Sequence, residues 1–323
     1  MRTDPMDPTD KVIDVVGLHQ RYGDFEAVRG LTFAVREGEL FALLGTNGAG
    51  KTTAMETIEG FRPAASGTVR VLGRDPHRER TAVRPATGVM LQEGGLFPDL
   101  TVAETVDLWR DLVPDARPRA EVLERVALAD KADVRARQLS GGQKRRLDLA
   151  LAIVGRPRVL FLDEPTTGMD PEARRATWRT VRDLVADGTT VLLTTHYLEE
   201  AERLADRLAI MHRGAVEVAG TVAEVLAGHG DRISFQVPPQ VPVAELPRPL
   251  GAEPRVAVGG GAPVATYTLT GQGGQGVQGA LRHLLDWADD RRLHLAGLQA
   301  RSASLEDVFL RVAGHPPVEE DHR

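Results

Sequence analysis

A glycine-rich loop near the N-terminus constrains the fold of this chain more than any other feature. Residues 45–53 read Gly-Thr-Asn-Gly-Ala-Gly-Lys-Thr-Thr and match the pattern G-x-x-x-x-G-K-[ST]. The apolar segment 39–45 precedes the loop and a helical pattern follows it, as the pattern requires. Glycines let backbone N–H groups curl around phosphate oxygens, and the N-terminus of the following helix adds positive potential. The sequence therefore predicts a phosphate-binding loop at the end of a buried strand.

The residue types in this loop suit a nucleoside triphosphate with its metal. Lys51 is one of only four lysines in the chain, and it lies where a compact positive charge can reach the β- and γ-phosphates. Thr52 offers a hydroxyl group to Mg²⁺. The loop residues predicted to bind the nucleotide are Gly45, Asn47, Gly48, Ala49, Gly50, Lys51, Thr52 and Thr53.

An acidic pair, Asp163 and Glu164, follows a second apolar run at residues 159–162. Ligands gather at the carboxyl ends of parallel strands, so Asp163 can reach Mg²⁺ held beside the phosphates. Glu164 can orient and polarise a water molecule for in-line attack on the γ-phosphate. A solvated acidic turn is the alternative for such a pair taken alone. With the upstream loop, the pair predicts a metal ligand and a general base.

A Leu-Ser-Gly-Gly-Gln run, residues 139–143, precedes an amphipathic helical pattern at 144–154. Ser140 suits a helix N-cap. Gly141 and Gly142 expose backbone N–H groups at the start of that helix, which makes a second anion-seeking site. One chain then has two γ-phosphate sites but one phosphate loop, which indicates that two copies share each nucleotide.

Alternating apolar and helical patterns predict the fold class. From Lys11 to about Ala227, short apolar runs alternate with helical patterns, as in an α/β domain with a mostly parallel sheet. Within it, residues 93–157 are expected to form a helical subdomain, and two runs to form an antiparallel β subdomain. The expected antiparallel strands are 12–18 and 31–35, the buried strands lie in 39–45, 83–92, 158–165 and 189–196, and the helices are 101–113, 119–130 and 171–188.

The composition changes after residue 228, where Gly and Pro become frequent. Alternating segments at 232–237 and 265–270 predict strands, and helical patterns occupy 281–290 and 304–314. We expect a small C-terminal α+β domain at 228–314. The Pro- and Asp-rich residues 1–10 and the tail 315–323 are expected to be disordered.

Charge and composition exclude several classes of protein. Forty basic and 46 acidic residues give a net charge of −6, which argues against general nucleic-acid binding. The chain has no cysteine, which excludes disulfides, thiolate metal sites and a cysteine nucleophile. No apolar run approaches the length of a membrane span, and the N-terminus does not resemble a signal peptide, so we expect a cytoplasmic protein.

Taken together, residues 11–227 resemble the ATP-binding subunit of an ABC transporter, whose signature is the Leu-Ser-Gly-Gly-Gln run. The resemblance implies ATP and Mg²⁺ as ligands and a P-loop NTPase fold. It also implies that Ser140, Gly141, Gly142 and Gln143 contact the nucleotide of a second copy in a head-to-tail dimer.

The same resemblance assigns four further residues. Tyr22 would stack on adenine, and Gln92 would touch Mg²⁺ and sense the membrane subunit. Asp170 would couple the two copies, and His196 would contact the γ-phosphate in catalysis with Glu164 and Lys51. The ordinary alternatives are a surface tyrosine, a polar loop residue, a helix cap and a structural histidine.

Within this family, the chain is most similar to drug-resistance exporters of the daunorubicin/doxorubicin type. The segments that indicate this are residues 167–175 and the Leu-Glu-Asp-Val-Phe-Leu run at 305–310. The resemblance implies that the chain works at the cytoplasmic face of the membrane with a separate polytopic permease. The insert at about 93–135 would bind the coupling helix of that permease. No nucleic-acid partner is expected.

Two other functions remain open from the residues alone. The first is a soluble ABC-type ATPase without a transport role, although the chain has a single cassette and no long coiled coil between Lys51 and Ser140. The second is a regulatory protein that binds ATP without using it, which the intact Glu164 and His196 disfavour.

Overall fold

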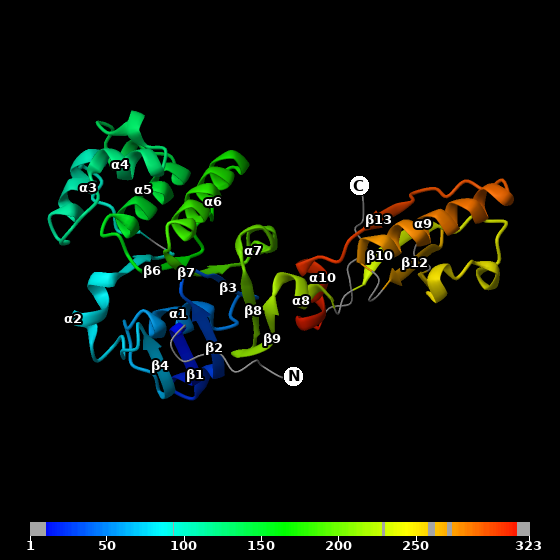
Figure 1. The fold of residues 1–323 in the computed structure, drawn as a ribbon, viewed down its shortest axis with the longest axis horizontal. Helices are drawn as coiled ribbons and strands as arrows, with labels where there is room; N and C mark the ends of the chain where they lie inside the picture. Colours follow the sequence, from blue (N-terminus) through cyan, green and yellow to red (C-terminus); the bar gives the residue numbers. More distant parts are fainter. Residues whose placement is uncertain (1–10, 93, 228–229, 258–261, 270–272, 315–323) are drawn as a thin grey trace. The chain divides into compact units, whose positions relative to one another are not determined.

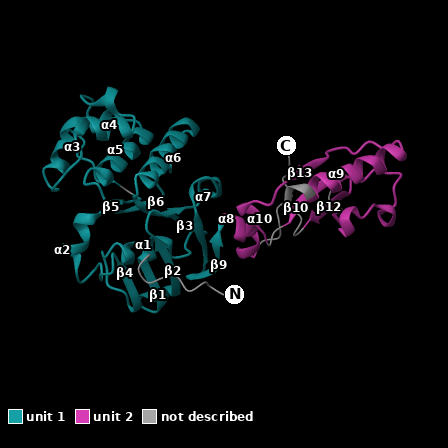
Figure 2. Ribbon diagram, in the orientation of Figure 1, with its two compact units in different colours: residues 1–221 teal, residues 222–323 magenta. Residues whose placement is uncertain are grey.

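The computed structural model describes residues 11–92, 94–227, 230–257, 262–269 and 273–314 (Figure 1). The chain divides into two compact units, residues 1–221 and 222–323 (Figure 2). The segments 1–10 and 315–323, expected to be disordered, lie outside the described residues. Among the described helices, none has the length and apolar character needed to cross a bilayer.

A six-stranded sheet forms the centre of the first unit, in the order β5-β6-β7-β3-β8-β9. The first five strands are parallel to one another, and β9 runs antiparallel to β8. Every residue of β3, β6 and β7 is buried, as their continuous apolar runs predict. The bounds are β3 (Leu40–Gly45), β5 (Thr87–Met90), β6 (Val159–Asp163), β7 (Thr190–Thr195), β8 (Arg207–His212) and β9 (Ala215–Thr221).

A three-stranded antiparallel sheet, β2-β1-β4, lies on one side of this centre. Strands β1 (Lys11–Tyr22) and β2 (Phe25–Arg36) confirm the predicted antiparallel layer, whereas β4 (Ser66–Val71) was not predicted. Helix α1 (Lys51–Ile58) contributes Ala54, Met55 and Ile58 to a core shared with both sheets. The phosphate loop therefore opens a helix held between two sheets.

The helical layer covers the opposite face of the central sheet (Figure 1). Its hydrophobic core includes the predicted face of α6, with Trp178, Val181 and Leu184 all buried. Two short helices complete the unit, α2 (Arg80–Val83) and α7 (Leu198–Leu204). The layer itself consists of α3 (Val102–Arg110), α4 (Arg119–Arg125), α5 (Gly141–Ile153) and α6 (Pro171–Ala186).

The helix predicted at 119–130 is wrong at its C-terminal end, because α4 stops at Arg125. Ala127 adopts a left-handed φ of 51°, its N–H bonds Glu124 O, and the N–H of Leu128 bonds Leu123 O. This is a Schellman ending with alanine in place of the usual glycine, so the sequence carries no stop signal. The helix predicted at 101–113 likewise ends earlier, at Arg110.

The second unit combines an antiparallel sheet, β11-β12-β10-β13, with three helices. Strands β10 (Asp231–Gln236) and β12 (Val264–Leu269) agree with the predicted segments. Helix α9 begins before the predicted segment because Val277, Ala280 and Leu284 pack at helical spacing against the sheet. The remaining elements are β11 (Arg255–Ala257), β13 (Gln299–Arg301), α8 (Val222–Ala227), α9 (Gly273–Asp290) and α10 (Leu305–Val312).

A buried carboxylate fastens α10 to this sheet. The side chain of Asp307 is only 4% exposed, and its Oδ1 lies 2.8 Å from Arg232 Nη1 and 3.3 Å from Arg301 Nη2. Its Oδ2 accepts a hydrogen bond from the N–H of Ser304 (3.2 Å). The Leu-Glu-Asp-Val-Phe-Leu run therefore has a structural role within the second unit.

Replacing this acid tests its contribution. Asp307→Asn removes the charge that pairs with two arginines, and we expect the free energy of unfolding to fall by about 2 kcal/mol. Hydrogen exchange should increase in peptides from residues 222–314 and not in those from the first unit. Glu306→Gln, on the exposed face of the same helix, is the control; equal effects of the two variants would contradict the role of Asp307.

Candidate nucleotide-binding site

The phosphate loop joins β3 to α1. Its backbone conformation and close contacts require glycine at several positions. Gly48 and Gly50 have φ values of 78° and 95°, in the left-handed region. A Cβ atom on Gly50 would lie 2.3 Å from Ala27 O, and one on Gly45 would lie 2.6 Å from Met211 O. No side chain caps the start of α1. Its first N–H groups therefore remain available to an anion.

The Lys51 ammonium group binds the backbone at the start of this loop. Its Nζ donates to Gly45 O (2.7 Å) and to Thr46 O (3.3 Å), and the residue is buried. Burial lowers the pKa of Lys51, while the negative charges of Glu164 and Asp163 oppose that change. One cation thus lies within electrostatic reach of both acids of the predicted pair.

Asp163 ends β6 and is held by the neighbouring strand. The Thr194 hydroxyl donates to Asp163 Oδ1, and the carboxyl group is buried. Burial raises the pKa of Asp163, and the bond from Thr194 opposes the rise. Thr194 was not identified from the sequence, although its place near the end of an apolar run was visible.

Glu164 lies next to His196 at the ends of adjacent strands. His196 Nδ1 is 3.2 Å from Glu164 Oε1, and the glutamate side chain is 13% exposed. The backbone of Glu164 has a φ of 49°, a strained conformation for a residue other than glycine, and its N–H bonds Thr194 O (3.0 Å). Such strain persists where the surroundings fix it, and it commonly marks functional positions.

Tyr22 ends β1 close to the loop. Its hydroxyl lies 3.4 Å from Thr53 Oγ1, and the side chain is half exposed. The guanidinium of Arg62 lies over the same ring, 4.9 Å from its centre. An exposed ring beside the phosphate loop can stack on a base.

The Leu-Ser-Gly-Gly-Gln run forms a helix N-terminus. Ser140 caps α5 by accepting from Gln143 N–H (3.2 Å), and Gln143 Oε1 accepts from Ser140 N–H (2.8 Å). Gly141 is exposed beside them. Within the described residues, no hydrogen bond or ion pair joins this run to the phosphate loop of the same chain.

Asp170 caps α6, as the sequence predicts. Its Oδ1 accepts from Ala173 N–H (2.9 Å) and Glu172 N–H (3.0 Å), and these bonds lower the pKa of the carboxyl group. Asp170 is exposed, so the cap leaves it accessible to a second copy.

Gln92 follows β5 and is exposed. Its backbone oxygen accepts from Arg145 Nη1 (3.0 Å), and Arg145 also binds the carbonyl oxygens of Asp163 and Glu164. No sequence motif identifies Arg145, because it lies in a run of basic residues, 144–146, of a kind typical of solvated helix faces.

Glu200 on α7 was also missed. It is fully buried, and its Oε1 accepts from Thr166 Oγ1 (3.0 Å) and Trp178 Nε1 (2.9 Å). Burial raises its pKa. It therefore connects the segment after Glu164 with the helix after His196, and only its place in the fold shows this.

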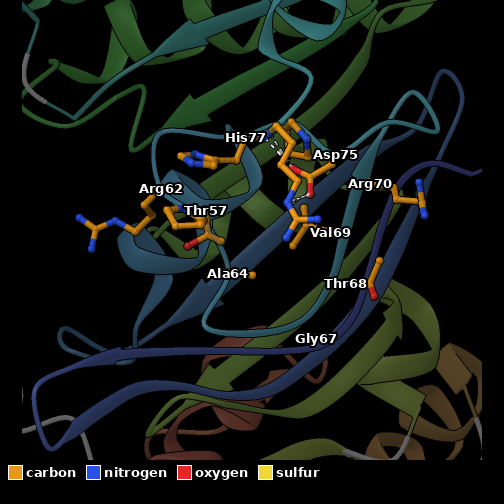
Figure 3. A pocket seen from close by; sticks show the side chains of 12 residues that line it. Thr57, Arg62, Ala64, Gly67, Thr68, Val69, Arg70, Asp75 and His77 are labelled. Atoms are coloured by element: carbon orange, nitrogen blue, oxygen red, sulfur yellow. Dashed lines mark hydrogen bonds and ion pairs between the residues drawn. The ribbon is translucent and has the colours of Figure 1, made fainter.

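A pocket of about 260 Å³ lies beside α1 and β4 (Figure 3). Thr57, Arg62, Arg70, Asp75 and His77 lie around it. None of its lining residues belongs to the set predicted from the motifs. The pocket is therefore separate from the motif residues at the loop edge of the sheet.

Comparison with known proteins identifies the family of the chain. Residues 28–167 match the family model "ABC transporter", and residues 231–304 match "ABC transporter domain-containing protein-like, C-terminal domain". The Nod factor export ATP-binding protein I of Paraburkholderia xenovorans is 39% identical over 304 residues, covering 92% of this chain and 95% of the relative. This chain belongs to the ABC transporter ATP-binding proteins. Two daunorubicin resistance ATP-binding proteins of Streptomyces coeruleorubidus are 39% and 46% identical, over 92% and 69% of this ABC protein.

Solved structures show the same fold. An ATP-binding subunit of an ABC transporter superposes with a TM-score of 0.61 at 27% identity, covering 66% of this chain and 91% of that one. A dimeric bacterial ABC transporter cassette gives 0.59 at 25% identity, covering 65% and 98%. The predicted α/β class with its antiparallel and helical subdomains is confirmed.

One buried glutamate near the site, Glu59, has no role in the predicted chemistry. Glu59 follows α1, and burial, with the charges of Asp163 and Glu56, raises its pKa to about 8. Its Oε1 has no hydrogen-bond partner within the described part of the chain. Because the pKa is raised on folding, the neutral carboxyl group favours folding at low pH, and this contribution is lost as the pH rises towards 8.

Glu59→Gln should remove that pH dependence. We expect the variant to unfold like the wild type near pH 4.5 and to gain stability over it up to pH 8, by at most about 5 kcal/mol. Urea unfolding at several pH values measures the difference. Glu199→Gln, which removes an exposed ion pair with Arg203, is the control, with a change of about 1 kcal/mol or less at every pH. A constant difference for Glu59→Gln at every pH would contradict the assignment.

Proposed function

We propose that this ABC protein binds and hydrolyses ATP with Mg²⁺ and powers an exporter through a separate membrane permease. The observation that carries the catalytic part is the approach of Glu164 to His196, at the strand edge that also holds Lys51 and Asp163. The export role rests on the relatives, which are named for Nod factor export and daunorubicin resistance.

Each residue at this edge has a separate role in binding or hydrolysing ATP. Lys51 and the N–H groups at the start of α1 bind the β- and γ-phosphates, and Tyr22 stacks on the base. Glu164 accepts a proton from the attacking water while His196 orients the γ-phosphate. The water oxygen bonds to the γ-phosphorus as the bond from that phosphorus to the β–γ bridging oxygen breaks, which leaves ADP and inorganic phosphate.

The donor atoms around the phosphates suit Mg²⁺. Asp163 supplies a buried carboxylate, Thr52 a hydroxyl and Gln92 an amide oxygen, which are the hard oxygen ligands this ion prefers beside phosphates. When bound, the ion neutralises charge that develops on the phosphate oxygens. Thr194 holds Asp163 in place for this role.

Two copies would work together. Ser140 and Gly142 of a second copy would approach the γ-phosphate, since the exposed end of α5 is not engaged by the loop of its own chain. Asp170 would lie at the same junction. ATP then holds the dimer closed, and hydrolysis opens it at the cytoplasmic face of the membrane, where the permease uses the movement.

Glu164→Gln tests the general base. We expect kcat for ATP hydrolysis to fall by about 10²–10⁴-fold, with ATP binding retained, because the amide cannot accept the proton. Sedimentation should show a dimer with ATP and a monomer with ADP. The control is Glu199→Gln, an exposed acid paired with Arg203 on α7, which should hydrolyse ATP normally. A wild-type rate in Glu164→Gln would exclude Glu164 as the base.

The trapped variant also tests the export role. Tagged Glu164→Gln, expressed in its native host and recovered from detergent-solubilised membranes with ATP, should co-purify with a polytopic membrane protein. Omission of ATP is the control. Recovery of a soluble partner alone would favour a non-transport ATPase, and an inactive wild-type protein would favour a regulatory one.

A further inference from the structure

We propose that Arg145 is a positioning residue that locks the loop of Gln92 to the strand end carrying Asp163 and Glu164. Because Arg145 and the Ser140 cap belong to the same helix, α5, Arg145 also connects the nucleotide site of its own chain with the surface around Ser140 that would contact the second copy. The inference rests on the proposed ATPase function and adds a residue that none of the motifs contains.

The four hydrogen bonds that Arg145 donates all go to backbone oxygens of two functional segments. Nη1 donates to Leu91 O (2.7 Å) and Gln92 O (3.0 Å). Nη2 donates to Asp163 O (2.9 Å) and Glu164 O (2.7 Å). One planar group thus holds the ends of β5 and β6, each by two carbonyl oxygens.

These oxygens lie where the pairing of the two strands ends. The β5–β6 ladder ends at the pair Met90 and Leu162. No ladder pair joins the two segments beyond that point in the described residues, and an unpaired carbonyl oxygen at a buried residue such as Asp163 is costly. Arg145 replaces the missing ladder with donors from a third element, so the two loops keep one relative position.

The guanidinium is enclosed and has a neighbouring counter-charge. Arg145 is 8% exposed, and its Nη1 lies 3.9 Å from Asp148 Oδ2 on the next turn of α5. Asp148 in turn lies against the loop after Gln92, where a Cβ on Gly94 would be 2.3 Å from Asp148 Oδ1. The Arg145–Asp148 pair therefore lies directly against Gly94.

Three functional segments meet around this arginine. It lines a pocket of about 540 Å³ whose walls include Gly94, Gly141 and Thr167. These residues belong to the loop after Gln92, the start of α5 and the segment before Asp170. Arg145 lies in the same 13-residue helix that Ser140 caps, so a shift of the cap carries the guanidinium with it.

An arginine suits this task better than a lysine. Its fork presents several N–H donors in one plane, whereas a lysine ammonium is a single point of donation. Four carbonyl oxygens on two segments can be bridged by the fork and not by one nitrogen. The identity of the side chain, and not only its charge, is therefore the testable feature.

The test compares Arg145→Lys and Arg145→Gln with the matched control Arg146→Lys. Arg146 lies in the same helix and also donates to backbone oxygens, of Val126 and Ala127, but these belong to the helical layer. Each variant is measured for kcat, KM, the Mg²⁺ concentration at half-maximal rate, binding of a fluorescent ATP analogue and melting temperature.

We expect both Arg145 variants to lose at least tenfold in kcat and to need more Mg²⁺. Binding of the analogue should stay within about threefold of wild type, because the phosphate loop is untouched. Arg146→Lys should behave as wild type.

Three results would overturn the inference. They are wild-type kinetics in Arg145→Gln, full activity in Arg145→Lys, and an activity loss in Arg145→Lys that parallels a loss of analogue binding and melting temperature. An inactive wild-type protein would instead refute the proposed ATPase function, so the two failures are distinguishable.

Discussion

The strand order around β7 is the constraint on which the rest of the site depends. Because β7 lies between β3 and β6, the carboxyl ends of three parallel strands meet at one edge. That edge brings the phosphate loop, the acidic pair and His196 close together. Full burial of all three strands leaves little room for a change of register. The sheet therefore determines where these residues lie, and the segments after its strands provide the side chains of the predicted site.

Much of this arrangement could be predicted from the sequence. The apolar runs ending at Gly45, Asp163 and Thr195 identify parallel strands, and glycines in the first loop identify a phosphate site. Asp163 is expected at this edge because it ends an apolar strand, whereas His196 is expected there from the resemblance to the ABC family.

Other features could not be predicted, because they depend on packing. The end of α4 has alanine at a left-handed position, and the early start of α9 depends on contacts with its sheet. Arg145 and Glu200 resemble ordinary charged helix residues until the fold encloses them. Their roles come from partners far away in sequence, which periodicity does not reveal.

Thr194 carries a consequence of a different kind. Its hydroxyl group donates to Asp163 and accepts a hydrogen bond from the N–H of Glu164 (3.2 Å), which also donates to the Thr194 carbonyl oxygen. One small side chain thus aligns both acids, although no recognition motif contains it. If a relative lacked this hydroxyl group, its residues equivalent to Asp163 and Glu164 would be held less precisely, even if every motif residue were present. Judging whether a related cassette is active therefore requires inspection of the strand beside its acidic pair.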